Sequence, residues 1–206
     1  MINIAVLVSG RGTNLQAIIN AIKRGAIDGK IEIVLSDNPG AYALKRAKRN
    51  DIKIQVVNYR SFSNKEEYEQ EVIQQLDNYK IDLIVLAGYM RILGSNFIKK
   101  YHSRIINIHP ALLPAFPGLN AQRQALKYGV KVSGCTVHFV DEGVDRGPII
   151  LQKAIEVKQS DDEESLSKRI LKYEHQLLPR AIQLFAQNKI QIVNNNRVRI
   201  KDSDNY

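Results

Sequence analysis

The residues of this chain best suited to chemistry lie in the short run Ile105–Pro110. Its isoleucines predict a strand, which the proline ends. Successive strand side chains point to opposite faces, so Asn107 and His109 share one face. An amide beside an imidazole places a hydrogen-bond donor next to a group that exchanges a proton near neutral pH. Taken alone, such a pair more often marks a solvent-facing strand end or a core histidine.

An acidic loop at residues 141–148 offers a partner for this pair, because it carries Asp145. A carboxylate near a histidine favours the protonated imidazole and fixes its orientation. An amide can donate to a carbonyl oxygen as that oxygen becomes an oxyanion. Asn107, His109 and Asp145 would therefore suit acyl transfer to an amine, with no metal and no covalent nucleophile. The sequence leaves open whether Asp145 reaches His109.

A glycine-containing turn near the N-terminus is a candidate anion site. An apolar strand is expected at residues 2–8, and apolar spacing from Leu15 onward predicts an amphipathic helix. Between them lie Gly12, Thr13 and Asn14, which could cap the helix or bind a phosphate at its positive end. A plain strand-to-helix turn is the alternative. The run is neither a Walker A loop nor a full dinucleotide fingerprint.

A second candidate binding segment, Gly88–Leu93, follows an expected strand. Its apolar side chains and single guanidinium, those of Met90, Arg91, Ile92 and Leu93, would suit a flat hydrophobic ligand with a polar rim. The alternative is a packed connector with an arginine that extends along its surface.

The remaining pattern alternates strands with helices. Strands are expected at 31–35, 54–57, 83–87, 132–140 and 149–155, and helices at 42–50, 64–79, 95–100 and 121–128. Residues 160–163 are expected to form a capping box that opens a helix to about residue 187, and short strands should flank Asn194–Asn196 before a polar tail at 201–206. This alternation predicts an α/β fold with a mostly parallel central sheet and ligands at the strands' carboxyl ends.

Composition favours one globular domain in the 206 residues. The net charge of +9 fits either a nucleic-acid or membrane surface or a basic protein with an anionic small substrate. Its basic residues are scattered, so we expect no nucleic-acid or membrane partner. Cys135 is the single cysteine, which excludes an intrachain disulfide and favours a cytoplasmic protein. We expect no signal peptide and no membrane span.

The motifs together resemble one family. The chain resembles the folate-dependent formyltransferases in the runs Asn107–Pro114 and Gly134–Asp145. It resembles the branch of that family that acts on glycinamide ribonucleotide in purine synthesis in the Ser9–Asn14 loop and in Ala87–Leu93. The resemblance covers about residues 1–187. It implies a Rossmann-like, three-layer fold with helices on both faces of the sheet, in a single formyltransferase domain over 1–206. Its parts would be a phosphate-binding half at 1–100, a catalytic and folate-binding half at 101–187, and C-terminal strands and tail at 188–206.

The resemblance also implies roles. The cosubstrate would be 10-formyltetrahydrofolate and the other substrate glycinamide ribonucleotide, with no metal. Asn107, His109 and Asp145 would be catalytic, with Asp145 raising the pKa of His109. The implied contacts to the ribonucleotide are Gly12, Thr13, Asn14 and Glu174, and those to the folate are Lys65, Met90, Arg91, Ile92, Leu93, Asn107 and Val140.

Three residues leave open questions. Lys65 could equally be an ordinary helix-start residue, and His138 is as readily a core histidine as a neighbour of the site. Arg146 follows Asp145 where many family members have a small residue, so its cation could compete for the carboxylate.

Three rival functions share parts of this pattern. A methionyl-tRNA formyltransferase needs a further nucleic-acid-binding domain, and a formyltetrahydrofolate deformylase carries a regulatory domain before its first strand. A non-catalytic mononucleotide-binding module would use the first loop alone. We expect a monomer or weak homodimer.

Overall fold

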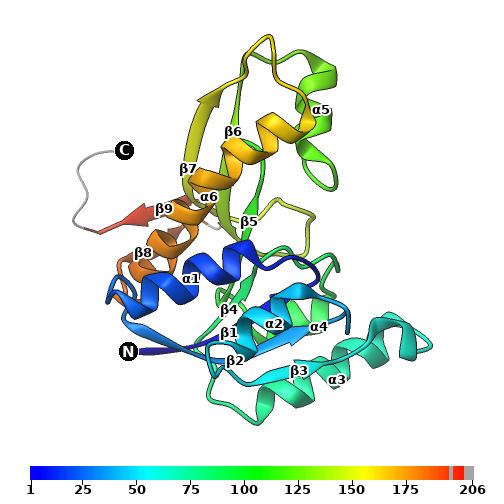
Figure 1. Cartoon of the computed structure of the whole chain (residues 1–206). Coiled ribbons are helices and arrows are strands. Elements are labelled where there is room, and N and C mark those ends of the chain that lie inside the picture. Colours follow the sequence, from blue (N-terminus) through cyan, green and yellow to red (C-terminus); the bar gives the residue numbers. More distant parts are fainter. Residues whose placement is uncertain (195–196, 202–206) are drawn as a thin grey trace. The chain divides into compact units, whose positions relative to one another are not determined.

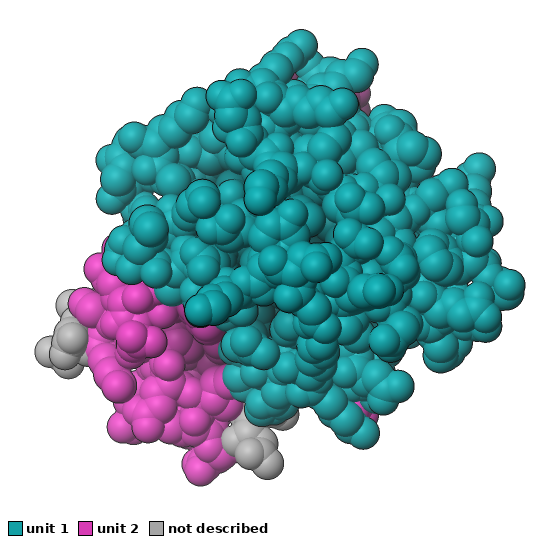
Figure 2. Space-filling view, turned by 90° about the horizontal axis from the view of Figure 1, so that it is seen from below, with its two compact units in different colours: residues 1–106 teal, residues 107–206 magenta. Residues whose placement is uncertain are grey.

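The computed structural model describes residues 1–194 and 197–201. The chain divides into two compact units, Met1–Ile106 and Asn107–Tyr206, which Figure 2 colours separately.

The first unit alternates strands and helices, as its sequence pattern predicts (Figure 1). Its strands are β1 (Ile2–Val8), β2 (Gly29–Ser36), β3 (Ile54–Val56) and β4 (Leu83–Leu86). Its helices are α1 (Thr13–Lys23), α2 (Tyr42–Lys48), α3 (Lys65–Asp77) and α4 (Ser95–Lys100), with a 3₁₀ turn, η1, at Tyr59–Ser61.

The strands of this unit lie in the order β3-β2-β1-β4 and are parallel. Residues Ile4–Val8 of β1 are fully buried, because a central parallel strand is covered on both faces. Right-handed crossovers place α1 and α2 on one face, because the chain moves outward from β1 to β3. The return to β4 places α3 on the other face. The carboxyl ends of the four strands therefore meet at one edge, where ligands of such sheets bind.

β5 (Ile105–His109) carries the chain from the first unit into the second. The later elements are α5 (Ala121–Tyr128), β6 (Val132–Phe139), β7 (Ile149–Glu156), α6 (Glu163–Ala186), β8 (Ile190–Val193) and β9 (Arg197–Ile200). β6 pairs antiparallel with β7, β9 continues parallel to β7, and β8 pairs antiparallel with β9. The expected α/β fold with a mostly parallel sheet is confirmed. The pairs β6–β7 and β8–β9 are its antiparallel part.

A glycine permits the tight pairing of β6 with β7. A Cβ atom on Gly134 would lie 1.9 Å from the carbonyl oxygen of Lys153, far inside van der Waals contact. The pairing sets the direction in which β6 presents Thr136 and His138, which are both buried.

Most expected elements agree with the structure, but the capping box of α6 lies two residues later than expected. The carboxylate of Asp162 accepts the Ser165 N–H at 2.8 Å, and the Ser165 hydroxyl accepts the Asp162 N–H at 2.9 Å. Asp161 instead accepts from Arg169. Of the expected C-terminal features, Asn195, Asn196 and residues 202–206 lie outside the described residues.

Candidate active site

In the second unit, the structure brings together Asn107, His109 and Asp145. Asn107 and His109 lie two residues apart on β5, and Asp145 lies in the loop between β6 and β7. The Nδ1 atom of His109 is 3.2 Å from Oδ2 of Asp145, and Nδ2 of Asn107 is 3.4 Å from Oδ1. One carboxylate therefore contacts both strand residues.

His109 is buried, with 4% of its surface exposed, and both ring nitrogens face acceptors. Nδ1 faces the Asp145 carboxylate, while Nε2 donates to the Phe116 carbonyl at 2.8 Å. A neutral imidazole has one N–H group, so it can donate to only one of these oxygens. Only the protonated ring satisfies both at once.

Burial nevertheless lowers the pKa of His109 below its ordinary value, because a low-dielectric surrounding disfavours the charged ring. The Asp145 carboxylate and the Phe116 carbonyl oppose this effect, and nearby His138 adds to it. Asp145 does push the pKa upward, as the resemblance implied. The net direction is nevertheless downward, because burial outweighs the carboxylate and the carbonyl.

Asp145 is held as an anion. Burial raises its pKa, but the Gly118 N–H and the two neighbouring histidines, His109 and His138, outweigh burial and lower the pKa overall. The Gly118 N–H donates to Oδ2 at 2.8 Å. Asp145 also adopts a left-handed backbone, with φ of 53°, which non-glycine residues rarely adopt. Loop conformation and hydrogen bonds thus aim the carboxylate at His109.

His138 belongs to this cluster, a point that the sequence left open. It is 1% exposed, and its Nδ1 donates to the Phe139 carbonyl at 2.8 Å. With the proton on Nδ1, the Nε2 lone pair can accept from Nδ2 of Asn107, 3.2 Å away. Nε2 also lies 3.5 Å from Oδ1 of Asp145. Since both neighbours engage Nδ2 of Asn107, they fix which way its amide points.

Arg146 does not disturb the carboxylate in the way its sequence position suggested. Among the described residues, the ion pairs of Asp145 are with His109 and His138, and Arg146 is in neither. A Cβ on Gly143 would lie 2.9 Å from Cδ of Arg146, so the arginine stem packs along Gly143 instead. Val140 directly follows β6 and is partly exposed.

In the first unit, the expected anion loop ends at the N-terminus of α1. Gly12 is the N-cap residue, with a left-handed φ of 70°, and no side chain caps the helix. Of the two alternatives for Thr13 and Asn14, the structure does not place them at the N-cap, because they are the first two residues of α1 itself. The first N–H groups of a helix lack intrahelical acceptors, so those of α1 suit an anion.

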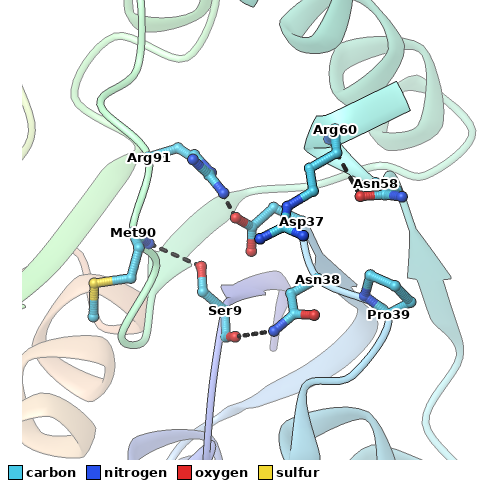
Figure 3. Close-up of a pocket in the computed structure, with 8 residues that line it drawn as sticks. All are labelled: Ser9, Asp37, Asn38, Pro39, Asn58, Arg60, Met90 and Arg91. Atoms are coloured by element: carbon cyan, nitrogen blue, oxygen red, sulfur yellow. Dashed lines mark hydrogen bonds and ion pairs between the residues drawn. The ribbon is translucent and has the colours of Figure 1, made fainter. Parts of the chain in front are cut away.

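The segment after β4 combines anchored and exposed residues. Met90 and Ile92 expose 62% and 64% of their surfaces, whereas Leu93 is buried and belongs to the core of the unit. Figure 3 shows Arg91 paired through Nε with Oδ2 of Asp37, at 2.6 Å. The Arg91 guanidinium also lies 4.0 Å above the Tyr59 ring. Arg91 is thus a fixed cation, not an arginine extended along the surface.

Two hydrogen bonds to α3 hold this segment in place. The hydroxyls of Tyr68 and Tyr89 are hydrogen-bonded, and the Gly94 N–H donates to Oε1 of Glu69 at 2.6 Å. Burial raises the pKa of Tyr68 to about 12, so the hydroxyl stays neutral. Lys65 is the first residue of α3, and its Nζ lies 3.8 Å from Oε1 of Glu69.

Glu174 is buried on α6. In the described ranges, no group of three or more His, Cys, Asp or Glu side chains could hold a metal ion. Over the same ranges, every helix is too short or too polar to cross a bilayer.

The sequence reasoning missed the groups that the segment after β5 contributes. The Phe116 carbonyl and the Gly118 N–H are backbone groups, which any residue could supply, so residue type gives no signal for them. The nearest signal is the Pro114, Pro117 and Gly118 series, which predicts an extended stretch followed by a turn.

The chain belongs to the formyl transferase family, whose pattern matches residues 2–182. It is 46% identical to phosphoribosylglycinamide formyltransferase of Bacillus subtilis, over 86% of this chain and 91% of that protein. It is 48% identical to the trifunctional purine biosynthetic protein adenosine-3 of Drosophila melanogaster, over 87% of this chain but only 13% of that protein.

Solved structures of related enzymes are similar to this chain in fold. Glycinamide ribonucleotide transformylase 1 from Symbiobacterium toebii is 48% identical, with a TM-score of 0.96, and the match covers 98% of this chain and 95% of that one. A formyltetrahydrofolate deformylase from Pseudomonas syringae is also similar in fold, with a TM-score of 0.90. Its identity is 27%, and this chain covers 66% of it.

Proposed function

We propose that the chain transfers the formyl group of 10-formyltetrahydrofolate to the amine of glycinamide ribonucleotide, a step of purine biosynthesis. Its relatives named for this activity match along about nine tenths of their length. The observation that carries the proposal is the Asn107, His109 and Asp145 cluster in a member of the formyl transferase family.

In the proposed reaction, the amine nitrogen attacks the formyl carbon and the carbonyl oxygen becomes an oxyanion. The Asn107 amide and the protonated His109 ring stabilise this oxyanion. The attacking nitrogen then loses a proton, the departing folate nitrogen gains one, and the bond from the formyl carbon to that nitrogen breaks. His109 transfers or donates the proton. Asp145 orients the His109 ring and balances its positive charge.

The timing of His109 protonation follows from its surroundings. Burial favours the neutral ring before reaction. Negative charge that develops on the formyl oxygen adds to that of Asp145 and favours the protonated ring as the intermediate forms. The formyl oxygen competes with the Phe116 carbonyl for the same Nε2 proton, so the reaction requires Nε2 to exchange one acceptor for the other.

The two substrates are assigned to the residues that the family resemblance implies. The turn of Gly12, Thr13 and Asn14 holds the ribonucleotide phosphate at the start of α1, and Glu174 faces the same substrate. The folate contacts that the resemblance implies include Met90 and Ile92, whose side chains are exposed. The other implied contacts are Lys65, Arg91, Leu93, Asn107 and Val140. We place this reaction in the cytoplasm.

The test is an absorbance assay of folate release, with and without glycinamide ribonucleotide. The proposal predicts release only when the amine substrate is present, with one formylated ribonucleotide for each folate. Release without the amine, with formate as product, would mean a deformylase. Ribonucleotide binding without turnover in either mixture would mean a mononucleotide-binding module.

A further inference from the structure

The turn between β1 and α1, which carries the proposed phosphate contacts, is held by α2. In the first turn of α2, the Ala43 N–H donates to the Gly10 carbonyl at 3.0 Å. A Cβ atom on Gly12 would lie 2.5 Å from Cβ of Ala43, so helix and turn are in close contact. Further along α2, Nε of Arg46 donates to the Arg11 carbonyl at 2.9 Å. Two successive carbonyl groups of the turn are therefore bound by one helix.

These bonds determine where the N–H groups of the turn point. The peptide that joins Arg11 to Gly12 is trans, so its C=O and N–H groups point in opposite directions. Because the Arg11 carbonyl points toward Arg46, the Gly12 N–H points away from α2. Within residues 1–194 and 197–201, this N–H has no backbone acceptor. It is thus available to an anion at the start of α1.

Arg46 is itself fixed by its neighbours. Its Nη1 donates to Oε1 of Gln16 in α1 at 3.3 Å, and Gln16 in turn donates to the side chain of Asn20 at 3.0 Å. The Arg46 guanidinium also lies 5.1 Å from the centre of the Tyr42 ring. Of the ion pairs in the described part of the chain, none includes Arg46. Its guanidinium therefore binds the turn and α1 rather than a carboxylate.

We propose that Arg46 is a positioning residue for the ribonucleotide phosphate. It holds the peptide between Arg11 and Gly12 so that the Gly12 N–H faces the phosphate, and it acts through this peptide rather than by contact with the substrate. The inference rests on the proposed function, because it requires the turn to bind glycinamide ribonucleotide. Arg46 should accordingly determine ribonucleotide affinity, and neither folate affinity nor the rate at saturation should depend on it.

The experiment measures steady-state formyl transfer by Arg46→Met, which keeps an unbranched apolar side chain and removes every donor. The KM for glycinamide ribonucleotide should rise about tenfold, the effect of losing one charge-assisted hydrogen bond. The values of kcat and of the KM for 10-formyltetrahydrofolate should stay within about twofold. A smaller folded fraction would instead lower kcat and leave both KM values unchanged, so the two causes are separable.

Two further variants separate position from charge. Arg46→Lys keeps the charge and one flexible donor but loses the planar fork that reaches both the Arg11 carbonyl and Gln16, so it should recover part of the affinity. Arg49→Met is the matched control. Arg49 lies 5.9 Å from the same Tyr42 ring and donates to the Tyr42 hydroxyl, so this variant should keep the native KM.

The amide resonance of Gly12 reports the geometry directly. Addition of ribonucleotide should shift it in the native protein and shift it less in Arg46→Met. An equal shift in both proteins would overturn the inference, as would a native ribonucleotide KM in Arg46→Met or an equal rise of that KM in Arg49→Met. If the native protein formylates no ribonucleotide, the proposed function itself fails. Native turnover with an unchanged KM in Arg46→Met removes only the present inference.

Discussion

The imidazole of His109 and the carboxylate of Asp145 are in direct contact, with Nδ1 and Oδ2 3.2 Å apart. Oδ2 also accepts the Gly118 N–H, and Oδ1 lies near both His138 and Asn107. A single carboxylate therefore connects two histidines, an amide side chain and a loop backbone. Changes at this carboxylate should alter the chemical step more than substrate binding.

Asp145→Asn is expected to lower kcat about 100-fold or more, because the neutral amide no longer stabilises the protonated His109 ring. The affinity for glycinamide ribonucleotide should stay within about twofold. Steady-state kinetics and calorimetric ribonucleotide binding measure the two effects separately. Asp141→Asn is the matched control, since this acid lies in the same loop and accepts the Gly143 N–H. An affinity loss at Asp145 with unchanged kcat would contradict the role assigned here.

His138→Phe is expected to lower kcat about tenfold with little change in KM, because Asn107 loses the acceptor that orients its amide. His138→Gln, whose side-chain oxygen can accept the same hydrogen bond, should recover part of the loss. Thermal unfolding of both variants reports the packing change separately. Should both variants retain full kcat, His138 would be a core residue only.

The stability of the protein should fall as the pH is lowered from about 7 toward 5. Because the native pKa of His109 lies below the unfolded value of about 6.5, the unfolded state binds more protons between these two values. Stability therefore rises with pH across this interval, and the depressed pKa of Asp145 extends the same slope below its ordinary value. Urea unfolding of native protein and His109→Gln between pH 5 and 8 measures this dependence. Identical slopes for the two proteins would be evidence against it.

Gly12→Ala should destabilise the first unit and weaken ribonucleotide binding. The left-handed backbone costs a non-glycine residue roughly 1–2 kcal/mol, and a Cβ here would lie 2.5 Å from Cβ of Ala43. Gly25→Ala is the control, because it has φ of 72° but no atom within 4 Å of the added Cβ. Urea unfolding should show a larger loss at Gly12. Equal losses would mean that close packing at Gly12 contributes nothing.

Much of the fold followed from hydrophobic spacing alone. The strand at residues 2–8 and the helices at 95–100 and 121–128 have the boundaries that their patterns predict, because apolar residues and turn residues coincide there. The start of α1 did not follow, since Thr13 and Asn14 look like capping residues. The left-handed backbone of Gly12 leads the chain into the helix, and the glycine itself is the sequence feature that indicates this conformation.

The part of the candidate site that lies on one strand could be predicted from strand periodicity, but the contributions of other segments could not. Asn107 and His109 share a face because they are two residues apart on one strand. His138 joins them only through the neighbouring position of another strand, which residue spacing does not specify. The net pKa of His109 likewise depends on burial, which the sequence does not quantify.

Single-turnover formyl transfer by His109→Gln, followed by rapid quench with labelled 10-formyltetrahydrofolate and saturating ribonucleotide, tests the central claim most directly. If His109 delivers the proton and stabilises the oxyanion, label transfer to the ribonucleotide slows by about 100-fold or more, while ribonucleotide affinity is retained. A variant that transfers the label at the native rate would show that the reaction does not use this imidazole.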